Sequence, residues 1–74
     1  MRDPRTNPQA GDVLRTVDIY TRQLVDITVA RVSHDEYTWP QVFYWKGTDG
    51  KEQQWPLSKW LRVAPDWEVI SVAN

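Results

Sequence analysis

Residues 41–61 read QVFYWKGTDGKEQQWPLSKWL, and this stretch holds the clearest signals of secondary structure in the chain. An apolar run leads into a turn signal at Asp49-Gly50, and a second short run ends at Trp55-Pro56. Aspartate and glycine adopt the positive φ that a hairpin turn requires, and proline ends a strand because it donates no ladder hydrogen bond. The pattern therefore predicts an antiparallel hairpin with strands at residues 42–46 and 51–55.

A short helical turn is predicted directly after this hairpin. Leu57, Trp60 and Leu61 fall at positions i, i+3 and i+4, which lie on one face of a helix. Because this face is wholly apolar, we expect all three side chains to turn towards the core of the domain.

Two further strands are predicted before the hairpin. Val13, Val17 and Ile19 share one parity along the chain, which predicts a strand over residues 13–20 with these side chains on one face. Val25, Ile27 and Val29 alternate with the polar Asp26 and Thr28, a period of two within residues 24–32. That alternation predicts a second, longer strand with one buried face.

The segments around these strands have less regular patterns. Residues 33–36 are polar and predict a turn. Residues 37–40 either begin the third strand or form a loop, because Pro40 cannot donate a ladder hydrogen bond. Residues 63–72 predict a fifth strand that is interrupted near Pro65-Asp66.

The length and composition predict one small domain with an aromatic core. The chain has 74 residues and no cysteine, but it carries 5 Trp, 3 Tyr and 1 Phe. A domain of this size buries only about 60% of its unfolded surface, so we expect three or four of the tryptophans in the core. The predicted core comprises Val13, Val17, Val25, Ile27, Val29, Trp55, Leu57, Trp60 and Leu61.

Five short strands with tight turns favour an all-β fold, a small barrel at residues 11–74. Residues 1–10 contain two prolines and no periodicity, and they predict an extended N-terminal arm, partly disordered or laid across the domain. The Gly-Asp opening, the Asp-Gly turn and the sequence WPLSKWLR before the last strand resemble the Src-homology-3-like barrels of the Tudor and KOW type. The resemblance covers residues 11–72 and implies a five-stranded barrel with a helical turn before its closing strand.

The first dozen residues carry a second resemblance. The motifs DPR at residues 3–5, NP at 7–8 and GDV at 11–13 look like the opening of many short proteins of phages and prophages. Those proteins also carry closely spaced tryptophans towards the C-terminus, as Trp55 and Trp60 are here. The resemblance implies a phage or prophage origin and a place in the cytoplasm of a bacterial host. It implies no activity.

Charge and hydropathy argue against two classes of partner. The net charge is −1, whereas nonspecific nucleic-acid binding needs a basic excess whose counterions are released. No apolar run approaches the roughly 20 residues of a membrane helix, and no apolar stretch follows the N-terminal arginines as in a signal peptide. The sequence therefore predicts a soluble, intracellular chain that does not bind membranes, and its net charge disfavours nucleic acid as a partner.

The residues needed for catalysis or for metal binding are scarce. The chain has no cysteine and a single histidine, His34, in a polar stretch that is typical of a solvated surface. Asp35 and Glu36 are adjacent, so on a strand they point to opposite sides and form no acid–base pair. Residues 47–50 lack the lysine and the helix of a phosphate loop. We predict no catalytic residue, no metal and no cofactor.

The aromatic residues remain as the signal of a binding surface. Phe43 and Trp45 share one face of the third strand, and Val42 and Tyr44 share the other, so only one pair faces inward. The other pair needs cover from the helix, the arm or a partner. The candidate binding residues are Tyr20, Tyr37, Trp39, Tyr44, Trp45 and Lys46. Tudor-like domains cage methylated cations with such rings, which the resemblance implies for Tyr20, Tyr37, Trp39 and Tyr44.

These observations favour a non-catalytic module that binds a protein partner, with a host or defence protein as the target that a phage origin implies. The first alternative is a nucleic-acid-binding module. It would require Lys46, Lys51, Lys59 and Arg62 to cluster on one face beside exposed aromatic rings. The second alternative is a minor structural phage protein.

Overall fold

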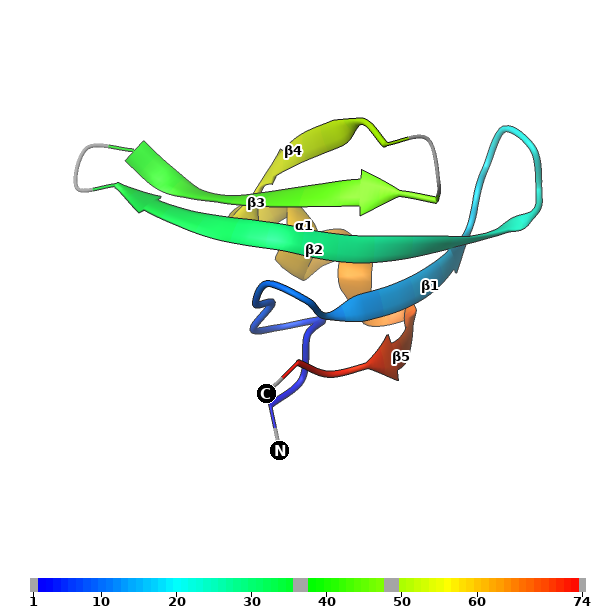
Figure 1. Cartoon of the computed structure of the whole chain (residues 1–74), viewed down its shortest axis with the longest axis horizontal. Coiled ribbons are helices and arrows are strands. Elements are labelled where there is room, and N and C mark those ends of the chain that lie inside the picture. The colour runs from blue at the N-terminus through cyan, green and yellow to red at the C-terminus, as the bar shows by residue number, and fades with distance from the viewer. Residues whose placement is uncertain (1, 36–37, 48–49, 74) are drawn as a thin grey trace.

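Five antiparallel strands form one sheet in the computed structural model, which describes residues 2–35, 38–47 and 50–73 (Figure 1). The strands are β1 (Val13–Val17), β2 (Leu24–Asp35), β3 (Thr38–Lys46), β4 (Glu52–Pro56) and β5 (Glu68–Ser71). Their order across the sheet is β4-β3-β2-β1-β5. The helix α1 (Leu57–Val63) and the 3-10 helix η1 (Ala64–Asp66) connect β4 to β5 on one side of the sheet.

This architecture confirms the prediction of five antiparallel strands with one short helix before the last strand. The edge strands β4 and β5 do not pair with each other in the part of the chain that the structure describes. The sheet is therefore open, and strand pairing does not close it into a barrel. Among the described residues, no helix is long and apolar enough to cross a membrane.

The hairpin of β2 and β3 is longer than the sequence predicted. The turn expected at residues 33–36 was wrong for residues 33–35, which continue β2, while Glu36 lies outside the described residues. Pro40 lies within β3, so the alternative of a loop at residues 37–40 does not hold for 38–40. The pairing register shifts beside it, which is where a strand tolerates a proline. The hairpin consequently extends beyond the rest of the sheet (Figure 1).

A bulge in β2 changes which side chains face the core. Val29 is opposite Tyr44 and Arg31 is opposite Phe43, so Ala30 is an extra residue on the β2 side. One inserted residue reverses the alternation of the strand. As a result, Val29 is buried and Val32 packs against the same core, although their positions have opposite parity.

The face predicted for the first strand was wrong. Leu14 is fully buried opposite Ile27, whereas Val17 is 52% exposed and Val13 is only half-buried. β1 also ends at Val17 instead of reaching residue 20. Parity along the strand favoured the three β-branched residues, but Leu14, which lies between Val13 and Val17, faces the covered side of the sheet.

Three of the five tryptophans form the centre of the core, in agreement with the expected number. Trp60 is fully buried, Trp67 is buried and Trp55 packs against them, with Tyr44 as the fourth ring. The ring centroids of Trp60 and Trp67 lie 5.2 Å apart in an edge-to-face arrangement, a favourable geometry for aromatic pairs. Because Val42 and Tyr44 are both buried, they are the pair of β3 side chains that faces inward.

The remaining core prediction was correct in part. Ile27 and Val29 are buried, and Leu57 is half-buried against the core. Val25 is half-buried but does not belong to the residues packed against this described core. Leu61 is exposed, because a seven-residue helix on the surface of the sheet buries only one narrow stripe. The core residues that were not predicted are Leu14, Val42, Tyr44, Ala64 and Trp67.

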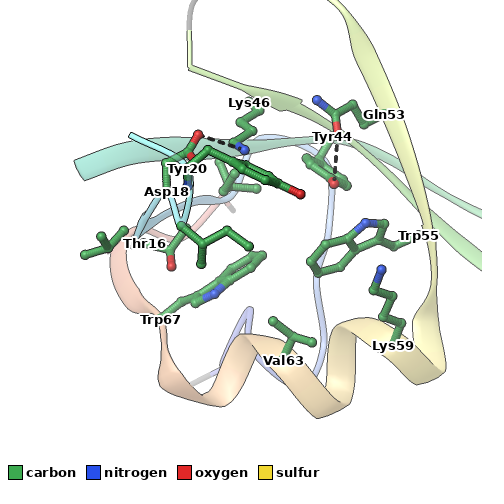
Figure 2. Close-up of a pocket in the computed structure, with 13 residues that line it drawn as sticks. Thr16, Asp18, Tyr20, Tyr44, Lys46, Gln53, Trp55, Lys59, Val63 and Trp67 are labelled. Carbon is green, nitrogen blue, oxygen red and sulfur yellow. Dashed lines mark hydrogen bonds and ion pairs between the residues drawn. The ribbon is translucent and has the colours of Figure 1, made fainter. Parts of the chain in front are cut away.

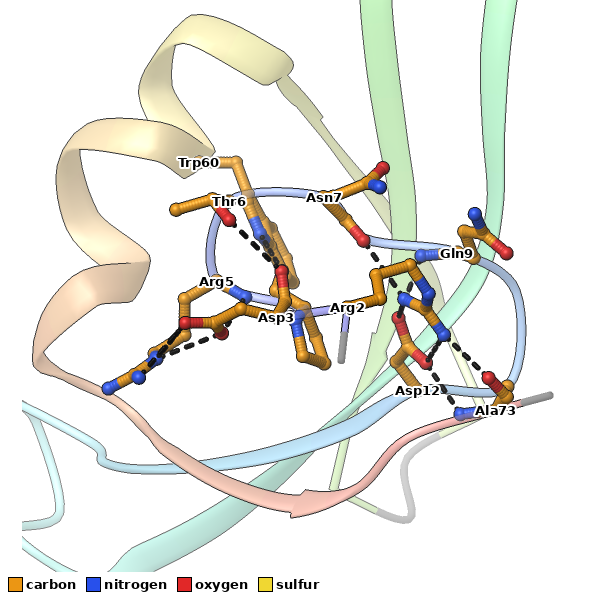
Figure 3. Close-up of polar contacts among 10 residues, drawn as sticks. Arg2, Asp3, Arg5, Thr6, Asn7, Gln9, Asp12, Trp60 and Ala73 are labelled. Atoms are coloured by element: carbon orange, nitrogen blue, oxygen red, sulfur yellow. Dashed lines mark hydrogen bonds and ion pairs between the residues drawn. The ribbon is translucent and has the colours of Figure 1, made fainter.

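Residues 2–10 form turns that lie across the domain, instead of an extended arm. Pro4 is buried, and its carbonyl oxygen accepts a hydrogen bond of 2.9 Å from Trp60 Nε1. This bond satisfies the indole N–H in the middle of the core, where an unpaired donor would be costly. The N-terminal segment is thus a structural cover for α1 (Figure 3).

A buried carboxylate joins this segment to the chain just after β5. Asp12 is 0% exposed and accepts hydrogen bonds from Arg2 and from the backbone N–H groups of Gln9 and Ala73, the latter two at 2.8 Å (Figure 3). Gly11 precedes it with φ at +95°, and a Cβ there would lie 3.1 Å from that of Ala73. The close approach of the two chain segments therefore requires glycine.

Candidate functional site

A hollow of about 370 Å³ opens between the loop that joins β1 to β2 and the helix α1 (Figure 2). Its walls are the inward side chains of the sheet and the aromatic cluster, including Tyr44, Trp55 and Trp67. Polar residues from the loop, β3, β4 and α1 surround its mouth. Segments that are far apart in the sequence thus meet around one aromatic cavity.

The aromatic walls consist of rings in mutual contact, with few free polar atoms. The rings of Tyr44 and Trp55 meet edge-to-face with centroids 5.4 Å apart, and those of Trp55 and Trp67 lie 5.7 Å apart. The Tyr44 hydroxyl donates a hydrogen bond of 3.2 Å to Gln53 Oε1. Burial raises the pKa of Tyr44, so the phenol is neutral at physiological pH. The cavity therefore offers apolar ring surface to a ligand.

The loop between β1 and β2, residues 18–23, is held in place by Asp18. Its carboxylate accepts a hydrogen bond of 2.8 Å from the Tyr20 backbone N–H. It also forms an ion pair with Lys46, with 3.0 Å between Oδ2 and Nζ. The Asp18 backbone N–H in turn donates to the Gln23 carbonyl at 2.9 Å. The bond from Lys46, followed by the backbone bond, lowers the pKa of Asp18, so the carboxylate stays charged near neutrality.

This ordered loop presents two large apolar side chains to solvent. Ile19 is 80% exposed and Tyr20 is 87% exposed, yet both contribute to the lining of the hollow. Figure 2 shows the Tyr20 side chain reaching over the cavity from the loop. A fixed loop with exposed apolar tips loses little conformational entropy when a partner covers it.

One positive charge at the mouth is not neutralised by any residue that the structure describes. Lys59 of α1 places its ammonium 4.5 Å from the centroid of the Trp55 ring (Figure 2). Within residues 2–35, 38–47 and 50–73, Lys59 makes no ion pair. Asp18 and Lys46 cancel each other, so the mouth carries a net charge of about +1.

The structure brings together three of the six predicted binding residues. Tyr20, Tyr44 and Lys46 all line the hollow. Trp39 is 82% exposed in the far part of the long hairpin and does not line it. Trp45 is on the sheet face opposite Tyr44, and Tyr37 lies outside the described residues.

Sequence reasoning missed most of the residues that line the hollow, among them Trp55, Lys59 and Trp67. Trp55 was assigned to the core, Lys59 to a basic patch, and Trp67 to neither. One signal was present: because Pro56 ends β4 and α1 begins at once, a lysine four residues after Trp55 lies within reach of its ring. Lys51 and Arg62, the other residues of the expected basic patch, do not line the hollow.

Neither a metal site nor a relative adds a further indication of function. In the described part of the chain, no group of three or more His, Cys, Asp or Glu side chains is placed to hold a metal ion. His34 is exposed on β2. A comparison of the chain with family models, with curated proteins and with solved structures finds no match in any of the three.

Proposed function

We propose that this chain is a non-catalytic binding module that docks a protein partner at the hollow between the β1–β2 loop and α1. The observation that carries the proposal is the pair of exposed apolar side chains, Ile19 and Tyr20, on an ordered loop beside an aromatic cavity. Aromatic residues around a concave, preformed site are typical of the energetic centres of protein interfaces.

Charge supports a protein partner over a nucleic acid. Lys46 is engaged by Asp18, and Lys51 and Arg62 do not line the cavity. The mouth therefore lacks the row of free cations that would follow a phosphate backbone. The net charge of −1 for the whole chain supports the same choice.

The scaffold and the origin are part of the same proposal. The strand order β4-β3-β2-β1-β5 and the helix before β5 support a Src-homology-3-like architecture. The DPR, NP and GDV motifs of residues 3–13 support a phage or prophage origin, with a protein in the cytoplasm of the bacterial host as the partner.

The test compares two variants of the loop with one variant of the hairpin. Proteins captured from the host by the wild-type chain are purified, and their dissociation constants are measured by calorimetry. Ile19→Ser and Tyr20→Ala should each weaken binding about 10- to 30-fold, the usual effect at an interface hot spot, with unchanged melting temperature. Trp39→Ala is the control, since Trp39 is equally exposed but lies away from the hollow. Loss of binding in Trp39→Ala alone would contradict the proposed surface.

A further inference from the structure

The charges around the hollow indicate what kind of group it accepts. An aromatic cavity can receive a cation, an apolar group or an apolar group with an attached anion. A cation is disfavoured on two grounds. The ammonium of Lys59 already lies over the Trp55 ring at 4.5 Å, and the acidic residue at the mouth, Asp18, is neutralised by Lys46 at 3.0 Å. A second cation would meet the first without a free carboxylate.

An anion, by contrast, finds donors there. Lys59 has three N–H donors and no ion pair among the described residues, and it is held at the cavity by the Trp55 ring. Gln53, which also lines the hollow, accepts from the Tyr44 hydroxyl through Oε1, so its side-chain N–H groups remain as donors. Both residues are at the edge of ring surfaces that favour apolar contacts.

The size of the hollow limits the occupant. About 370 Å³ is near the lower end of the range of ligand sites, which runs from about 300 to 1,000 Å³. A space of this size accepts one large apolar side chain and leaves room for the backbone beside it, which the exposed Ile19 and Tyr20 can also contact. The carboxylate would then lie next to that side chain, at the level of Lys59.

We infer that the hollow binds an acidic peptide segment of the partner, with one large apolar side chain inserted among the rings and a neighbouring carboxylate paired to Lys59. This inference rests on the proposed function, because it names the chemistry of the partner at the same site. It also replaces the expectation of a cage for methylated cations, because the charge at the mouth that no described residue neutralises is the positive charge of Lys59, which repels a cation.

Four blocked tripeptides test the two requirements separately: Ac-Glu-Phe-Glu-NH2, Ac-Gln-Phe-Gln-NH2, Ac-Lys-Phe-Lys-NH2 and Ac-Glu-Gly-Glu-NH2. Binding is measured by NMR titration, following the indole N–H signals of Trp55 and Trp67. The acidic phenylalanine peptide should bind about three- to fivefold more tightly than its amide counterpart, the range expected for one partly exposed charge pair. The basic peptide and the glycine peptide should bind more weakly than both.

Three variants of α1 identify the residue that is responsible. Lys59→Gln should abolish the preference for the acidic peptide, and Lys59→Arg should retain it. Arg62→Gln removes an equal charge from the same helix outside the hollow, and should leave the preference unchanged. The inference is wrong if the basic peptide binds best, if no peptide shifts the two indole signals, or if the preference persists in Lys59→Gln.

The purified partner separates this inference from the proposed function. If Tyr20→Ala weakens partner binding but Lys59→Gln does not, the proposed docking surface is supported, and the pairing of a partner carboxylate with Lys59 is refuted. If both variants bind the partner as the wild type does, the docking surface itself is wrong. If both weaken binding, and only Lys59→Gln also reduces its dependence on salt, the inference is supported.

Discussion

Replacing Asp12 by asparagine tests whether the buried carboxylate holds the two ends of the fold together. Its oxygens accept two hydrogen bonds from Arg2 and one each from the Gln9 and Ala73 backbone N–H groups. Asparagine preserves the shape, but it removes the charge and puts an NH2 group where an acceptor stood. At least one of the four donors must then face another donor inside the protein.

The size of the effect follows from these four bonds. A hydrogen bond to a charged group contributes about 1.5–3 kcal/mol, and the variant loses or weakens at least two of them. Because Arg2 at the rim of the site can turn towards water, we expect the lower end, a loss of about 3 kcal/mol. A chain of 74 residues has a free energy of unfolding of about 4–11 kcal/mol, so Asp12→Asn removes a large part of it.

The same carboxylate predicts a difference between wild type and variant that depends on pH. Burial alone would raise the pKa of Asp12, but the hydrogen bonds from Arg2, Ala73 and Gln9 outweigh it and lower the pKa in the folded state. The stabilisation is therefore complete above the unfolded value of about 3.9 and is lost as the pH falls through the folded value. Asp12→Asn should lack this component.

Urea unfolding followed by tryptophan fluorescence measures both effects at pH 7, 5 and 3. The difference in unfolding free energy between wild type and Asp12→Asn should be nearly equal at pH 7 and 5, and smaller at pH 3. A difference below about 0.5 kcal/mol at pH 7, the size of an ordinary surface substitution, would refute the reasoning. A difference in unfolding free energy that stays constant down to pH 3 would refute the conclusion that the charged form of Asp12 stabilises the fold.

Three further predictions concern the core, the backbone and the partner class. Trp60→Ala should lower the unfolding free energy by about 3–5 kcal/mol and leave the Pro4 carbonyl unpaired, and a cooperative denaturation curve of near-normal stability would contradict this. Gly11→Ala should cost about 1–2 kcal/mol in the same assay, because φ is +95° and the new methyl group approaches Ala73; an unchanged midpoint would show that the two segments can separate freely. Titration with duplex and single-stranded DNA at about 150 mM salt should show nothing tighter than the nonspecific range of ~10⁻⁴–10⁻⁶ M, whereas submicromolar, salt-dependent binding would favour the nucleic-acid alternative.

Local patterns in the sequence were sufficient to predict the order of the elements. The spacing of Leu57 and Trp60 placed α1, and Pro56 placed the end of β4, because each signal lies within one or two turns of chain. Which side chains of a strand face the core was predictable only where apolar and polar residues alternate along the whole strand. Ala30 breaks this alternation through a bulge, and Leu14 reverses the expected face of β1, because contacts with other strands decide both.

The candidate site was predicted to a smaller extent for the same reason. Tyr20, Tyr44 and Lys46 were selected by residue type, and they meet because the β1–β2 loop folds back over β3. The sequence could not show that Trp67 joins them, since it is separated from Lys46 by a strand and two short helices. Trp39 had the same chemical signal, but it lies on the far part of the hairpin.

The link between Arg2 and Ala73 has a consequence for the order of folding. The Arg2 guanidinium donates to the Ala73 carbonyl at 2.7 Å, across 71 positions of sequence. The entropy lost on closing so long a loop must be offset by contacts that already exist, so we expect this link to form after the sheet has assembled. The described chain is thus nearly a closed ring, because Arg2 and Ala73 lie side by side and the two coloured ends of the ribbon run close together (Figure 1). In a circularly permuted chain that is joined near Arg2 and Ala73 and opened in the exposed β1–β2 loop, the covalent join would hold these two segments together before the sheet forms.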